Sequence, residues 1–275
     1  MRFTHIVGVF FICLVLGGCV LNLGEPPTEG WLYTSTRDGL VRVSLERAEK
    51  EIIPGCAGTL AASDGVLYSL CGDIIYAYDR DGNELRRIPL PEEPRGRNIV
   101  GLVALGEAGF ALLDNDDDKV YFVGPSGEFL REVSIVNTPD TRWQNMYGVV
   151  ANGRLIISED GYNRLMSVDL TTYEVSVFKD LGYLPHWLGA LAYRDGVFYL
   201  CGPTSVYAFA EDEDPVKIAE VPRGNISGIV MLGDYIYTSS NFAGAIYRTT
   251  ISTGDTETWV EGLNFPEELV FLPAG

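Results

Sequence analysis

Short apolar runs that meet at a glycine turn recur along most of the chain. LAASDGVLYSL at 60–70, VVANGRLIIS at 149–158 and LAYRDGVFYL at 191–200 each hold two such runs around Asp-Gly or Asn-Gly. β-Branched and aromatic residues on both sides of a two-residue turn of this kind are typical of a β-hairpin. LVALGEAGFALL at 102–113 and IVMLGDYIYTS at 229–239 repeat the pattern with glycine beside Glu or Asp. The sequence therefore predicts five hairpins.

The hairpins recur at a nearly constant distance. They start at residues 60, 102, 149, 191 and 229, which are 42, 47, 42 and 38 residues apart. Each is followed by two more strand-like runs around a turn, as in DIIYAYDRDGNELRRIPL at 73–90 and KVYFVGPSGEFLREVSI at 119–135. Four strands in about 42 residues is the repeat of a β-propeller blade. No stretch has a long helical period, so the fold class is all-β.

The two ends of the repeat region complement each other. LVFLPAG at 269–275 is a first strand without its hairpin partner, and GWLYTSTRDGLVRVSLERAEKEIIP at 30–54 has three strands but lacks the first. Joining them completes a blade and removes an exposed sheet edge. We therefore predict a single domain over 30–275. It is a six-bladed β-propeller with four strands per blade, closed by the C-terminal strand completing the N-terminal blade. A sandwich of repeated hairpins would explain neither the period nor the complementary ends.

The blades resemble those of NHL-repeat propellers. ALLDNDDDKVYFVGPSGEFLREV at 111–133 and IISEDGYNRLMSVD at 156–169 are similar to that family's strand, Asp-x-x-Asn-x-Arg turn, strand and glycine turn. Asp160, Asn163 and Arg164 match the polar turn positions, with the Asn-Arg spacing one residue shorter than in the family. The resemblance implies a six-bladed propeller. Gluconolactonase-like and paraoxonase-like enzymes share that fold.

The first 18 residues have the pattern of an export signal. Arg2 precedes an uncharged apolar run over 6–16, and 11 residues are too few to span a bilayer as a helix. Leu16-Gly17-Gly18-Cys19 resembles the cleavage box of bacterial lipoproteins. The resemblance implies that 1–18 is a lipoprotein signal peptide and that Cys19 carries lipid. An ordinary signal peptide or an uncleaved anchor is the alternative.

Residues 19–29 then form the lipidated cysteine and a short tether. Fully extended, the ten residues after Cys19 reach about 30 Å, so the propeller would stay close to the membrane. The expected location is the outer side of the cell membrane or the outer membrane, with the membrane contacted through the lipid anchor.

Charge excludes one class of partner. The chain has 38 acidic and 20 basic residues, a net charge of −18. Loss of 1–18 removes Arg2 and no acid, so 19 basic residues face 38 acidic ones and the charge becomes −19. Nucleic-acid binding requires clustered Lys and Arg, so no nucleic-acid partner is expected. His186 is the one histidine beyond residue 20, which excludes zinc sites built from several histidines.

Aligning the repeats brings three asparagines to one position. Asn98, Asn145 and Asn225 each lie three residues before a glycine, whereas the other copies place Cys56, Trp187 and Phe265 there. Their carbonyl oxygens, with charge from Glu267 or Glu268, form a candidate Ca²⁺ site at the tunnel mouth. The structural alternative is that short polar side chains at blade junctions cap backbone groups.

His186 is a candidate general base, because its ordinary pKa suits proton transfer. A surface or packing histidine is the simpler alternative. With Trp187, Trp143 and Tyr147 it belongs to an aromatic sector that suits a sugar or peptide ligand. The ligand-binding candidates are Asn98, Asn145, His186, Trp187 and Asn225.

Gluconolactonase-like enzymes carry Asn-Gly directly before the first strand, and this chain departs from that pattern. Val100, Tyr147 and Ser227 precede the aligned glycines. A metal-dependent hydrolase is therefore the second interpretation.

Cys56 and Cys71 lie at paired ends of one predicted hairpin, which predicts a disulfide in an exported protein. Cys201 lies in another repeat and is expected to be free.

The favoured function is a surface-exposed, lipid-anchored binding or protein-assembly module for a protein, small-molecule or carbohydrate ligand. The alternative is a Ca²⁺-dependent lactonase- or esterase-like hydrolase at the tunnel mouth. A third is an accessory subunit of an envelope complex that uses an outer face.

Overall fold

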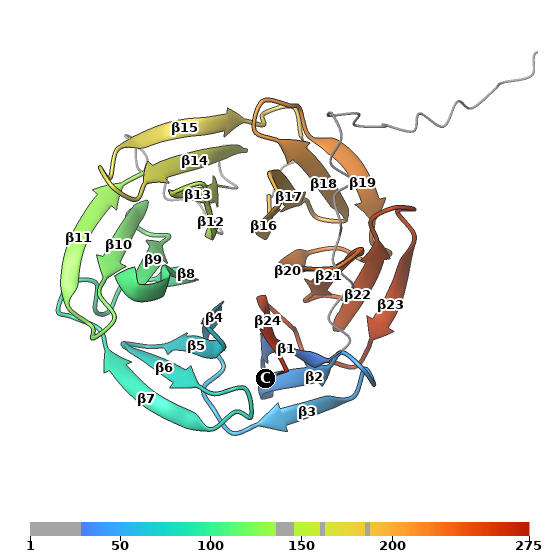
Figure 1. Cartoon of the computed structure of the whole chain (residues 1–275), viewed down its shortest axis with the longest axis horizontal. Helices are drawn as coiled ribbons and strands as arrows, with labels where there is room; N and C mark the ends of the chain where they lie inside the picture. The colour runs from blue at the N-terminus through green and yellow to red at the C-terminus, as the bar shows by residue number, and fades with distance from the viewer. Residues whose placement is uncertain (1–28, 136–145, 160–162, 185–187, 275) are drawn as a thin grey trace, which may run out of the picture.

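The computed structural model describes residues 29–135, 146–159, 163–184 and 188–274, and it contains six four-stranded antiparallel sheets arranged in a ring (Figure 1). The predicted all-β, six-bladed propeller with four strands per blade is confirmed, as is closure of the ring by the C-terminal strand. The 1–18 signal peptide, the lipidated Cys19 and most of the tether lie outside the described residues.

The strands are numbered along the chain, and the blades are numbered from the one that closes the ring. Blade 1 consists of β24 (Leu269–Pro273), β1 (Gly30–Thr36), β2 (Gly39–Ser44) and β3 (Lys50–Ile53). Blade 2 consists of β4 (Thr59–Ser63), β5 (Val66–Cys71), β6 (Ile74–Tyr78) and β7 (Glu84–Pro89). Blade 3 consists of β8 (Ile99–Ala104), β9 (Phe110–Asp114), β10 (Lys119–Val123) and β11 (Phe129–Ser134). Blade 4 consists of β12 (Met146–Ala151), β13 (Arg154–Glu159), β14 (Arg164–Asp169) and β15 (Val175–Asp180). Blade 5 consists of β16 (Leu191–Arg194), β17 (Val197–Cys201), β18 (Ser205–Ala210) and β19 (Val216–Glu220). Blade 6 consists of β20 (Ile226–Leu232), β21 (Tyr235–Ser240), β22 (Ala245–Thr250) and β23 (Thr256–Val260). A 3₁₀ turn, η1 (Gly106–Ala108), joins β8 to β9. Within the described part of the chain, no helix is long and apolar enough to cross a bilayer.

Two-residue turns fix the register of three of the predicted hairpins. Asp64-Gly65, Asn152-Gly153 and Asp195-Gly196 join β4 to β5, β12 to β13 and β16 to β17. Both residues of each turn have positive φ, between 51° and 85°. Asn, Asp and Gly tolerate this left-handed conformation best, and it matches the twist of the paired strands. These hairpins therefore form where the sequence pattern predicts them.

Most of the apolar surface is buried between blades. Six hydrophobic clusters fill the six junctions between neighbouring blades. In one of them, Leu70 and Ile75 of blade 2 pack with Leu102 and Phe110 of blade 3, and all four are at most 6% exposed. Burying such a side chain contributes roughly 1.5–3 kcal/mol. Each blade thus contributes to two clusters, and its stability depends on both neighbours.

The ring closes by strand pairing between the two ends of the propeller. β24 is antiparallel to β1, with the register running from Gly30 opposite Pro273 to Thr34 opposite Leu269. Gly30 has a φ of 142°, and a Cβ there would lie 2.5 Å from the Phe271 ring. Only glycine fits this position without displacing the closing strand.

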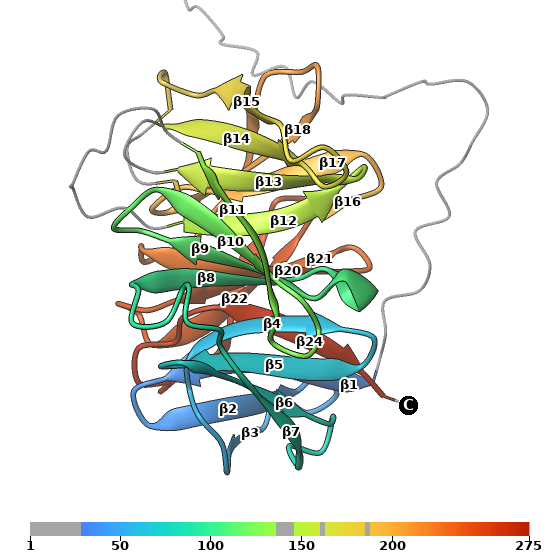
Figure 2. The same cartoon turned by 90° about the vertical axis from the view of Figure 1, so that its left-hand side faces the viewer.

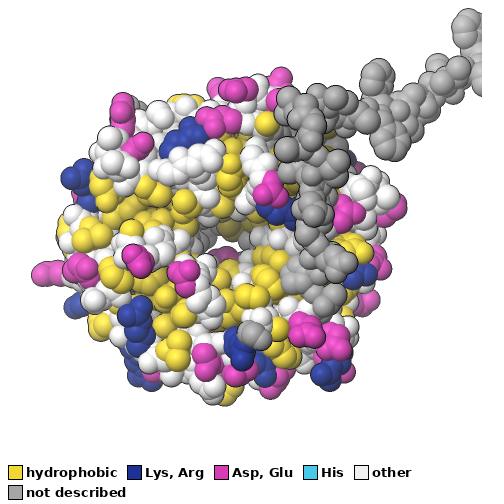
Figure 3. All heavy atoms as spheres, in the orientation of Figure 1, with side chains coloured by type: hydrophobic (Ala, Val, Ile, Leu, Met, Phe, Trp, Pro, Cys, Tyr) yellow, Lys and Arg dark blue, Asp and Glu magenta, His cyan; other side chains and the backbone are white. Residues whose placement is uncertain are grey.

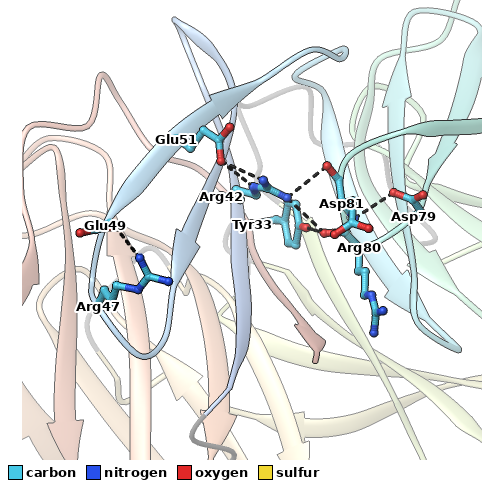
Figure 4. Close-up of polar contacts among 8 residues, drawn as sticks. All are labelled: Tyr33, Arg42, Arg47, Glu49, Glu51, Asp79, Arg80 and Asp81. Atoms are coloured by element: carbon cyan, nitrogen blue, oxygen red, sulfur yellow. Dashed lines mark hydrogen bonds and ion pairs between the residues drawn. The ribbon is translucent and has the colours of Figure 1, made fainter. Parts of the chain in front are cut away.

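Polar contacts hold the closing blade against blade 2 (Figure 4). Arg42 on β2 donates from Nε to Glu51 of β3 at 2.9 Å and from Nη1 to the Asp81 carbonyl at 3.1 Å. The buried Tyr33 hydroxyl donates to the Arg80 carbonyl. Both carbonyls belong to the turn after β6, so these bonds fix blade 1 against the next blade around the ring.

The structure joins Cys56, which precedes β4, to Cys71 at the end of β5 by a disulfide, the pairing expected from the hairpin. Ser69 supports the same corner, because its hydroxyl donates to the Cys56 carbonyl at 2.7 Å and accepts from the Gly58 N–H at 3.1 Å. Cys201 is a buried free thiol, and burial raises its pKa. The bond ties the segment that leads into blade 2 to the end of that blade's second strand.

Replacing Cys56 and Cys71 together by alanine should lower the free energy of unfolding by about 3 kcal/mol, because the bond closes a loop of 15 residues in the unfolded chain. Urea unfolding measures the loss. Reductant should lower the stability of the wild type to that of the variant and leave the variant unchanged. Separate alkylated Cys56 and Cys71 peptides after non-reducing digestion would show that the bond does not form.

Candidate functional site

A tunnel runs through the centre of the ring between the six innermost strands, β4, β8, β12, β16, β20 and β24. Each begins on the face that also carries the turns between second and third strands, and we call this the mouth face. The innermost strands end on the opposite, exit face, where η1 and the C-terminus lie (Figure 2). Since β1 is antiparallel to β24, Gly30 also lies on the exit face.

The tunnel holds a cavity of about 300 Å³. Its wall consists mainly of small and aliphatic residues from all six innermost strands, including Ala61, Leu102, Val149, Leu191, Ile229 and Val270. Glu268, directly before β24, is the one charged residue among the described lining residues. A ligand in the tunnel would therefore meet an apolar wall with a single carboxyl group.

A second cavity of about 390 Å³ opens at the mouth of the tunnel. It shares five lining residues with the tunnel cavity, so the two spaces adjoin: Thr59, Val100, Tyr147, Ser227 and Glu268. Asn225, Asn241 and Glu267 add polar groups to its lining, and Phe265 adds an aromatic ring. We call this the mouth cavity. Hydroxyl, amide and carboxyl groups from blades 1, 2, 4 and 6 meet there.

Hydrogen bonds to neighbouring strands fix the segment that carries the two glutamates. Ser227 of β20 donates to the Pro266 carbonyl at 3.1 Å, and Ser239 of β21 donates to the Glu267 carbonyl. The Glu267 N–H donates to the Ser35 carbonyl at 3.0 Å. The segment before β24 is thus held by blade 6 on one side and by β1 on the other.

Glu268 is the group with the most perturbed ionisation in the mouth cavity. Burial, and next the neighbouring Glu267 carboxylate, raise the pKa of Glu268 to about 8. The Ser35 hydroxyl donates to its Oε2 at 3.0 Å, which only partly offsets the increase. Glu268 is therefore largely protonated at neutral pH, and a cation beside it would favour its ionised form.

Glu267 faces a neighbouring side pocket of about 450 Å³, lined also by Arg37 and Phe265. The Arg37 guanidinium lies 4.2 Å from the Phe265 ring centroid. Phe242, 73% exposed, makes an edge contact with that ring at 5.9 Å between centroids. Burial raises the pKa of Glu267, and Arg37 partly counteracts this. The rim of the mouth thus combines a cation, a carboxylate and two aromatic rings.

The structure separates the predicted site residues. Asn225 and Glu267 line the mouth cavity together. Asn98 does not line it, since its side chain donates to Asp116 at 3.0 Å. Asn145, His186 and Trp187 lie outside the described residues, as does Cys19. Within the described ranges, no group of three or more His, Cys, Asp or Glu side chains is arranged to hold a metal ion.

Three asparagines that precede innermost strands make the same structural contact. Asn98, Asn225 and Asn264 each donate from the side chain to the turn after the second strand of the same blade, at 2.8–3.0 Å. Each also accepts a backbone N–H from that turn through its carbonyl. In blade 1 this residue is Asn264, and not the aligned Phe265. Asn225 alone of the three also lines the mouth cavity.

The aligned repeats also contain a signal for Glu268, beside the Glu267 that the sequence suggested as a metal ligand. Glu268 falls in the column that contains Gly101, Gly148 and Gly228, and it is the one charged residue there. Thr59 and Ser227 gave no such signal. Small polar residues are common beside strands, and only the closed ring brings these two to one cavity.

Known structures support the fold. No protein-family model matches the chain, and no curated protein matches its sequence. A chain of a nidogen/laminin complex matches with a TM-score of 0.69 and 8% identity, covering 88% of this chain and 98% of that one. A streptogramin B lyase matches with a TM-score of 0.57 and 14% identity over 90% and 92% of the two chains. Virginiamycin B lyase from Staphylococcus aureus matches with a TM-score of 0.54 and 17% identity over 78% and 76%. At these identities the likeness concerns the fold alone.

Replacing Glu268 by glutamine should stabilise the protein above neutral pH. The folded protein holds a proton on Glu268 up to about pH 8, whereas an unfolded glutamate loses it near pH 4.3. Stability therefore falls as pH rises through this window, and Glu268→Gln removes that loss. A pKa raised from about 4.3 to about 8 corresponds to a loss of up to about 5 kcal/mol. We therefore expect equal melting temperatures near pH 4 and a variant that melts up to roughly 10–20 °C higher at pH 8.

Glu261→Gln is the matched control, because Glu261 is an exposed glutamate shortly before the same strand. Its melting curve should follow the wild type at every pH. A Glu268→Gln variant that also follows the wild type from pH 4 to 8 would show that Glu268 ionises normally.

Proposed function

We propose that the protein is an exported propeller, anchored through lipid on Cys19, and that its mouth cavity binds a ligand at the outer surface of the cell. The observation that carries this proposal is that the mouth and tunnel cavities, about 390 and 300 Å³, adjoin and share Glu268 in their walls. Largely preformed concave sites with an apolar wall and a few convergent polar groups are the usual form of a ligand site.

The chemistry of the mouth limits the ligand. An apolar wall with one carboxyl group suits an extended group that ends in a hydrogen-bond donor or a cation. At the rim, Phe242 and Phe265 offer ring faces and edges for a sugar ring or a peptide side chain. A peptide end meets both requirements, a sugar ring meets the requirement at the rim, and polyanions meet neither.

Plugging the junction between the two cavities tests this proposal. Thr59→Trp would fill the space that Thr59 borders in both cavities. Ser176→Trp, on the exposed outer strand β15, is the matched control. Detergent-solubilised full-length protein is applied to glycan and peptide arrays. We expect binding of the wild type and of Ser176→Trp, and a loss of about ten-fold or more for Thr59→Trp. Equal binding by all three would exclude the mouth cavity.

A Ca²⁺-dependent hydrolase of lactonase or esterase type is the second candidate. It is favoured by one observation, the presence of Asn225 and Glu267 in the same cavity. The names of the two lyases are a precedent for catalysis on this fold. This candidate also requires Asn145, which lies outside the described residues, and Asn98 would have to leave Asp116 to join the ligand set.

Calcium-dependent melting and hydrolysis of a simple γ-lactone distinguish the two candidates. If the hydrolase proposal holds, millimolar Ca²⁺ raises the melting temperature, and Glu267→Gln removes both the increase and the turnover. Asp38→Asn, at an exposed acidic residue of the side pocket, is the control. A melting temperature that does not respond to Ca²⁺, together with no turnover, would exclude the hydrolase and leave the binding module as the remaining proposal.

A further inference from the structure

The exit face is the side on which the described chain begins and ends. Gly30 pairs with Pro273 at the end of the closing strand, so both lie on this face. The lipid anchor proposed at Cys19 is separated from Gly30 by ten residues, which reach about 30 Å when fully extended. A compact domain of about 250 residues has a radius of gyration of roughly 18 Å, so this reach is smaller than the expected width of the domain. The exit face is therefore the face that the anchor holds nearest to the bilayer.

An apolar groove opens on this face between blades 3 and 4. It encloses about 420 Å³ and is lined almost entirely by apolar residues. Leu105 and Ala108 border it at η1, Leu130 at the start of β11, and Val150 near the end of β12. Leu130 is 47% exposed and Val150 is 38% exposed. Two large apolar side chains with this exposure therefore face one groove.

Charged side chains lie around the perimeter of the exit face and also beside the groove, where Glu107 of η1 is exposed (Figure 3). Figure 3 shows this face, with hydrophobic side chains over blades 3 and 4 and around the central opening. At the edge of the groove, Tyr173 lies below the Arg131 guanidinium, 4.5 Å from the ring centroid. A tyrosine and an arginine beside an apolar patch are the residues that occupy the polar–apolar boundary of membranes.

We propose that the groove between blades 3 and 4 rests on the lipid bilayer, so that the exit face lies against the membrane and the mouth cavity opens away from it. This inference rests on the lipid anchor of the proposed function. Leu130 and Val150 would enter the headgroup–acyl boundary, with Arg131 reaching the phosphates. The net negative charge of the chain opposes contact through its other surfaces with anionic lipid. The apolar residues of the groove therefore make the contact with the bilayer, and the tether strengthens it by keeping the domain close to the membrane.

Two labelling sites on opposite faces test the orientation. Leu130→Cys places an environment-sensitive NBD label in the groove, and Phe242→Cys places the same label at the rim of the mouth, where the native side chain is 73% exposed. The buried thiol of Cys201 stays protonated and unlabelled. Thr171→Cys, on the exposed β14–β15 turn of the exit face, is a second groove-side position in case Leu130→Cys does not fold.

Full-length lipidated protein is reconstituted into phosphatidylcholine vesicles that contain spin-labelled lipid. We expect NBD at residue 130 or 171 to gain about two-fold in emission and to be quenched by the spin label, and NBD at residue 242 to show neither change. Equal exposure of both labels on vesicle-bound protein would overturn the proposal. So would burial of the groove label in native membranes but not in pure lipid, which would mean that a membrane protein covers the groove.

Flotation of the protein with the vesicles tests the lipid anchor independently of the two labels. If mass spectrometry shows Cys19 unmodified, the proposed anchor has failed, and a chain that begins at residue 19 and carries Cys19→Ser is then held on nickel-chelating lipid through an N-terminal hexahistidine tag, so that the introduced cysteine is the one accessible thiol. The two labels then report which face meets the lipid in either case.

Discussion

The structure depends on one requirement: each blade must bury both faces of its sheet, and only a closed ring provides two neighbours for every blade. The six interblade clusters meet this requirement, with residues such as Leu70 and Leu102 packed across a junction. The pairing of β24 with β1 is what closes the circle. Without it, blade 1 would lose its innermost strand and blade 6 would lose part of its covering surface, because Leu269 packs in the cluster between them.

The same closing segment carries the chemistry of the tunnel. Pro266, Glu267 and Glu268 lie where the chain enters β24, held by Ser227 and Ser239 of blade 6 and by Ser35 of β1. A carboxyl group at this place is surrounded by the apolar wall that the innermost strands form. Ring closure therefore both stabilises the fold and raises the pKa of Glu268.

Antiparallel connectivity also places different groups on the two faces. The mouth face combines carboxyl, amide, hydroxyl and aromatic groups around a concave site. The exit face carries both ends of the described chain and an apolar groove at Leu130 and Val150. Because the innermost strands all run in the same direction, the ends of the described chain and the mouth cavity lie on opposite faces of the domain.

Local strand patterns and the repeat spacing are enough to predict the propeller, its six blades, its closure and the hairpin turns. They also pointed to Asn225 and Glu267, which occupy two different positions of the aligned repeats. The folded ring was needed to show that Asn98 bonds Asp116 away from the cavity, that Asn264 replaces Phe265 in the repeated contact, and that Thr59 and Glu268 meet. Which side chains converge depends on the orientation of each blade around the tunnel, and that is set by packing between blades distant in the sequence.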